Sequence, residues 1–118
     1  MIKTILWLIL AAIHALPALA FFRPSTLTQL YGLAADNPLF LLMHHRAALF
    51  FAVFVACVWA AFIPDGRRVA VLVVGISMVS FLALYWMAGS PFPLRRIALV
   101  DLAGLPVLAA VAWFAFRG

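Results

Sequence analysis

The chain has 118 residues, of which 69% are hydrophobic and 9% are charged, and its formal net charge is +5. A water-soluble domain carries roughly 25% charged residues, so this composition excludes an ordinary soluble domain. The basic residues are scattered between apolar runs, which is typical of helix flanks at anionic headgroups rather than of nucleic-acid binding. We therefore expect membrane lipids, and no nucleic acid, as partners.

A single integral membrane domain is expected over residues 1–118. No linker, low-complexity tract or internal repeat divides the chain. The lone cysteine, Cys57, allows neither an intrachain disulfide nor a multi-cysteine metal site, and we expect no bound metal.

The first apolar run extends from Ile2 to about Phe22, with Lys3 at its start. A basic start, an apolar centre and small residues at the end are also typical of a cleaved signal peptide, which is the alternative. Because His14 and Pro17 interrupt the apolar centre, we expect an uncleaved first transmembrane helix.

The connection that follows predicts a short amphipathic helix lying along the membrane interface. The first helix is expected to end at Arg23-Pro24, and a new helix is expected to begin with Ser25 or Thr26 as its cap. Gly32 or Asp36-Asn37 is expected to end it. Asn37-Pro38 then opens the second spanning helix, with proline in or near its first turn.

The second apolar run is long enough, at ~1.5 Å per residue, to cross a ~30 Å hydrocarbon core. Ala48, Ala52, Ala56 and Ala60 recur every four residues along it. Such a row of small residues lets another helix approach closely. We therefore expect this row to face protein rather than lipid.

The rest of the chain predicts two more spanning helices. Pro64-Asp65-Gly66 predicts a tight turn with glycine free to take positive φ, and Ser90-Pro91-Phe92-Pro93 predicts a break. The predicted fold class is an all-α membrane protein with four transmembrane helices in an up-down-up-down bundle, plus the short interfacial helix between helices 1 and 2. The expected spans are about residues 2–22, 39–62, 69–89 and 95–116.

Both termini fall on one side of this bundle, and basic residues divide almost evenly between the two sides. If Arg46 is paired inside the membrane, then Lys3, Arg67 and Arg68 favour cytoplasmic termini. We expect a multi-pass protein of the bacterial inner (plasma) membrane with both termini in the cytoplasm. The near-even division leaves dual topology open.

Polar residues of all four predicted helices lie at similar depths near one membrane face. Burying a polar side chain in the membrane is energetically costly, so each needs a hydrogen-bonding or charged partner or a functional role. We expect them to form one polar layer that contains the candidate ligand-binding residues. These are His14, His44, His45, Arg46, Tyr85 and Asp101.

Arg46 and Asp101 are the expected structural ion pair, since a carboxyl in lipid needs a proton or a cation. His14, or a histidine of the second helix, is the alternative partner of Asp101, and Tyr85 is a further donor. On a helical wheel Arg46 points away from the two adjacent histidines. We therefore expect the histidines and the arginine to face different neighbours.

Several functions fit such a layer. It can be a structural network that fixes helix register, a site for a lipid headgroup, quinone or small polar ligand, a proton path, or a haem site between His14 and His44 or His45. No nucleophile lies next to a base, so we expect no enzymatic activity. We also expect no bound cofactor, with haem and quinone as the alternatives. The predicted function is a structural or accessory subunit that packs against other membrane subunits or itself. The alternative is a small transporter or a lipid- or quinone-binding protein.

Three stretches resemble a group of small bacterial four-helix inner-membrane proteins. They are Leu30-Tyr31-Gly32, the run from His44 to Phe50, and Leu94-Arg95-Arg96 with Asp101. No activity is established for that group, although some members carry a phosphopantetheine adenylyltransferase name. This chain does not support that name, because it has no soluble nucleotide-binding fold and no Gly-rich phosphate loop. The resemblance implies a membrane location and importance for the His-Arg and Asp positions.

Overall fold

The computed structural model describes residues 1–32, 34, 36–91 and 94–117. Regular structure within them is entirely helical, and four of the helices are long and apolar enough to cross a membrane. The elements are α1 (Ile2–Phe22), α2 (Ser25–Tyr31), α3 (Leu39–Phe62), the 3₁₀ turn η1 (Pro64–Gly66), α4 (Arg67–Met87) and α5 (Arg95–Arg117). The all-α class and the four candidate spans are thereby confirmed, whereas insertion into a membrane stays a prediction.

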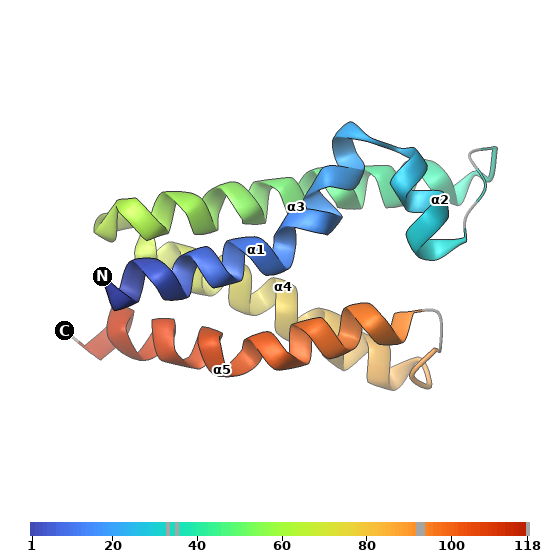
Figure 1. Ribbon diagram of the computed structural model, residues 1–118. Coiled ribbons are helices and arrows are strands. Elements are labelled where there is room, and N and C mark those ends of the chain that lie inside the picture. Colours follow the sequence, from blue (N-terminus) through green and yellow to red (C-terminus); the bar gives the residue numbers. More distant parts are fainter. Residues whose placement is uncertain (33, 35, 92–93, 118) are drawn as a thin grey trace.

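Successive long helices run antiparallel, and both ends of the chain lie at the same end of the bundle (Figure 1). The connection η1 lies at that end too, while α2 lies at the opposite end. This is the expected up-down-up-down order. Helix α1 packs between α3 and α5, so it contributes to two helix interfaces at once.

Local chemistry explains where the connections begin and end. Gly32 ends α2 in the left-handed conformation, with φ of 66°. The expected cap of α2 is wrong: Pro24 occupies the cap position and Ser25 is already helical, so neither Ser25 nor Thr26 caps the helix. The carbonyl oxygen of the Asn37 side chain accepts the Leu39 N–H at 2.9 Å and so opens α3.

The turn between α3 and α4 differs from the expected one. Gly66 has φ of −88°, so the turn uses no positive φ there, and α4 begins at Arg67 rather than at residue 69. Both arginines of this turn bond to the carbonyl ends of neighbouring helices. Arg67 donates to the carbonyl oxygens of Ala60 and Ala61, at 2.7 and 3.1 Å, and Arg68 donates to a carbonyl near the end of α5.

The tightest pair of helices is α1 with α3, and hydrogen bonds join it at both ends. Thr4 Oγ1 donates to the Ala61 carbonyl oxygen at 3.0 Å, and the His44 ring lies 2.9 Å from the Phe21 carbonyl oxygen. The main core lies in the half of the bundle that holds the termini. Its largest fully buried side chains are Trp7, Leu10, Val74, Met78 and Val111.

The alanine row of α3 faces protein over only part of its length. Ala60 is fully buried in the core, whereas Ala52 is exposed. A four-residue step advances about 400° around a helix, so each step turns the row by roughly 40°. The row therefore winds out of the α1–α3 interface, which explains the difference from the expected protein-facing stripe.

Candidate functional site

A cavity of about 250 Å³ lies between α1 and α5, with Phe50 of α3 at one wall. Most of its lining is apolar. Its three polar residues are His14 of α1 and Arg96 and Asp101 of α5. Two of the six predicted site residues, His14 and Asp101, are thus brought together.

His14 is 1% exposed and uses only one of its two ring nitrogens. Nδ1 lies 2.8 Å from the Leu10 carbonyl oxygen, and a carbonyl can only accept, so Nδ1 is the nitrogen that donates. No partner for Nε2 is found in the described part of the chain. In the neutral ring Nε2 carries a lone pair, so His14 presents an unused hydrogen-bond acceptor beside the cavity.

Pro17 explains why α1 leaves space at this level. Proline has no N–H, so the carbonyl oxygen four residues earlier, that of Ile13, loses its helical donor. Such positions bend a helix, and α1 changes direction along its length in Figure 1. His14 lies just before the proline, and both line the cavity.

Asp101 is 6% exposed and lies on the buried face of α5 together with Ala98, Gly104 and Leu108. Gly104 permits the close approach of α5 that places Asp101 there. A Cβ atom at Gly104 would lie 2.8 Å from Ile13 Cδ1 and 2.8 Å from Met78 Cε. A carboxyl so deeply buried requires hydrogen-bonding or charged partners, or a proton.

Arg46 lies in a neighbouring groove between α3 and α4, with a volume of about 430 Å³. Its Cζ is 4.7 Å from the ring centroid of Phe50 and 5.2 Å from that of Phe81. Phe50 separates this groove from the cavity, since its ring is also 6.1 Å from that of His14. The direct ion pair between Arg46 and Asp101 stays a prediction.

The other predicted site residues lie outside the cavity. His44 bonds to the end of α1, and His45 is exposed. Tyr85 is half-buried, and its ring lies 6.1 Å from that of Phe81, nearly parallel to it. Side chains at equal depth along the helices therefore do not all point toward the same space. A haem pair would require a second histidine opposite His14, and neither His44 nor His45 lines the cavity.

Phe50 and Arg96 are cavity residues that were not among the predicted site residues. The sequence spacing did not indicate Arg96, because five residues turn about 140° around a helix and so separate it from Asp101 on a helical wheel. No pattern in the sequence identifies Phe50 as the wall between cavity and groove. Among the described residues, no group of three or more His, Cys, Asp or Glu side chains could hold a metal ion. No protein family, curated protein or solved structure matches the chain.

Proposed function

We propose that this chain is a non-enzymatic, multi-pass protein of the bacterial inner membrane that binds a lipid-soluble ligand in the α1–α5 cavity. The observation that carries this proposal is the buried His14 Nε2, which has no partner within the described chain and lies beside a cavity it shares with Asp101. Leaving a buried acceptor unsatisfied costs about 1–3 kcal/mol, which a bound ligand can recover.

The lining favours a particular ligand chemistry. His14 Nε2 accepts a hydrogen bond, so the ligand must bring a hydroxyl or amine donor to it. A quinol supplies such a hydroxyl, whereas an oxidised quinone carries only acceptors. The apolar walls of the cavity suit the ring or chain to which this donor group is attached.

Native mass spectrometry from a mild detergent tests this proposal. The wild-type chain is expected to carry a small lipid-soluble molecule, and His14→Phe is expected to lose it. His45→Phe is the matched control, because His45 is exposed and lies outside the cavity. Equal retention of the molecule by both variants, or a ligand-free wild-type chain, would contradict the proposal.

A second candidate is an accessory subunit that packs against another membrane subunit. The α3–α4 groove favours this role, because it is open and borders the exposed Ala52, where a helix from another subunit can approach closely. A pull-down from mild detergent with wild-type chain is expected to recover a membrane protein that Ala52→Trp fails to recover. Recovery of the same protein by both chains would contradict this role for the groove.

The proposed orientation has both termini in the cytoplasm, because Lys3, Arg67 and Arg68 lie at that end of the bundle. A reporter that is active only in the cytoplasm, fused to the carboxyl terminus, is expected to be active. An inactive fusion, alongside an active periplasmic reporter, would reverse this orientation.

A further inference from the structure

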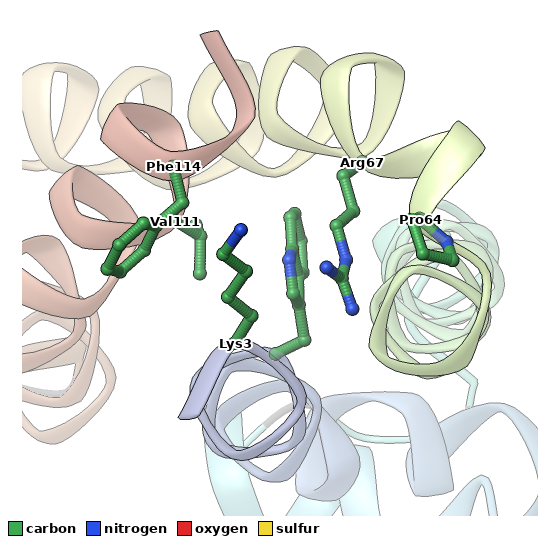
Figure 2. Close-up of a pocket in the computed structure, with 6 residues that line it drawn as sticks. Lys3, Pro64, Arg67, Val111 and Phe114 are labelled. Carbon is green, nitrogen blue, oxygen red and sulfur yellow. The ribbon is translucent and has the colours of Figure 1, made fainter. Parts of the chain in front are cut away.

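A second, smaller pocket lies at the end of the bundle that holds both termini. Its volume is about 140 Å³, and it is lined by Lys3, Trp7, Pro64, Arg67, Val111 and Phe114. Figure 2 shows Lys3 reaching into this space from α1 and Arg67 reaching toward it from α4, with Val111 and Phe114 of α5 beside Lys3. Three helices thus meet around two cationic side chains.

Hydrogen-bond donors dominate the polar lining of this pocket. Arg67 uses Nε and one N–H of Nη2 on the end of α3, which leaves the other N–H groups of its guanidinium available. Lys3 Nζ lies 5.3 Å from the centroid of the Phe114 ring and retains its donors. Trp7 is 1% exposed and lines the pocket, and its indole nitrogen can only donate.

No carboxylate belongs to the described lining of this pocket. Asp65, in the adjacent turn, is exposed and is not one of the lining residues. The positive ends of the α1 and α4 dipoles lie at this end of the bundle, which favours an anion further. The opposing carbonyl ends of α3 and α5 are already occupied by Arg67 and Arg68.

The size and position of the pocket identify the kind of anion. A volume of about 140 Å³ would hold four to five waters at roughly 30 Å³ each, so a single phosphate group fits. The pocket lies at the end of four apolar helices, which is the level of lipid headgroups when such a bundle spans a bilayer. We propose that the Lys3–Arg67 pocket binds the phosphate of an anionic phospholipid headgroup.

Delipidated protein in an uncharged detergent tests this assignment. Its melting temperature is measured with added phosphatidylglycerol, with phosphatidylcholine, and with inorganic phosphate at the same concentration. Phosphatidylglycerol is expected to raise it most, by a few degrees, since binding only to the folded chain stabilises it. An equal rise with phosphatidylcholine would overturn the preference for an anionic lipid, and an equal rise with inorganic phosphate would overturn the lipid as source.

Variants show whether this pocket is where phosphatidylglycerol binds. Lys3→Gln is expected to weaken phosphatidylglycerol binding about tenfold, as expected for loss of one charge-assisted hydrogen bond, and Lys3→Arg is expected to retain it. Arg117→Gln is the matched control, because Arg117 carries the same charge at the same end of the bundle but does not line the pocket. If Arg117→Gln weakens binding as much as Lys3→Gln does, general surface charge binds the lipid and the assignment to this pocket is overturned.

Discussion

The α1–α5 cavity and the Lys3–Arg67 pocket differ in the hydrogen-bonding groups they present. The α1–α5 cavity lies part-way along the helices and offers buried acceptors, His14 Nε2 and the Asp101 carboxyl, with a single cation, Arg96. The Lys3–Arg67 pocket lies at the helix ends and offers only donors from its described polar side chains. Two helices, α1 and α5, contribute to both.

This difference follows from what the backbone can supply at each place. Helix ends expose free carbonyl groups, and the arginines there use them: Arg67 and Arg68 both bond to helix carboxyl ends. In mid-helix the backbone is already bonded, so His14 reaches only the carbonyl four residues earlier and has one nitrogen left over. An unused acceptor in mid-helix is therefore a stronger sign of a missing ligand than a cation at a helix end.

The largest effect is expected from a substitution at the close contact of α5 with α1 and α4, next to the cavity but away from the other pocket. Gly104→Leu drives a side chain into Ile13 and Met78 and should lower the free energy of unfolding by about 1–3 kcal/mol. Gly75→Leu is the matched control, because a Cβ there meets nothing within 4 Å. Thermal unfolding in detergent measures both variants, and equal stability of the two would show that α5 does not approach α1 this closely.

A smaller effect is expected from the pocket at the helix ends. Arg67→Gln removes two hydrogen bonds to the end of α3 and should lower the free energy of unfolding by about 1–2 kcal/mol. Lys3→Gln removes a pocket charge without such bonds and should change it by less than about 0.5 kcal/mol. Denaturation of the delipidated chains separates the structural role of Arg67 from the ligand-binding role of Lys3. A larger loss of unfolding free energy with Lys3→Gln than with Arg67→Gln would contradict this assignment.

Arg46 and Asp101 provide a test of whether the cavity and the α3–α4 groove are coupled across Phe50. Asp101→Asn and Arg46→Gln should each lower the melting temperature, and the double variant should lose less than the sum of the two. A coupling free energy above about 0.5 kcal/mol is expected. Additive losses in thermal unfolding would show that the two charges do not interact.

The smallest effect is expected from the two adjacent histidines of α3. His45→Leu should change the free energy of unfolding by less than about 0.5 kcal/mol, because the side chain is exposed. His44→Leu should cost about 1 kcal/mol, since it removes the bond to the Phe21 carbonyl. Thermal unfolding that ranks them the other way would contradict this division of roles.

The sequence predicted the helices well and the site only in part, for a physical reason. Apolar runs bounded by proline and arginine set where the long helices lie, and rise per residue sets depth. The direction of a side chain around its helix axis depends instead on packing between helices. His14 and Asp101 therefore meet as two members of the expected layer, while Arg46 turns into the α3–α4 groove and His45 is exposed.

The Lys3–Arg67 pocket was missed because its basic residues were interpreted as simple membrane flanks. A signal was present: Lys3 and Trp7 lie four residues apart, on one face of the first helix. Only the start of α4 at Arg67, two residues before its expected start, brings the second cation to that face. Arg67 also bonds to the end of α3, a contact that spacing along the chain does not reveal.

Ligand binding at His14 can be checked in an experimental density map of protein purified with its native lipids. We expect density in the α1–α5 cavity from a molecule other than water, with a donor atom about 3 Å from His14 Nε2. An empty cavity, or one filled by water alone, would contradict it.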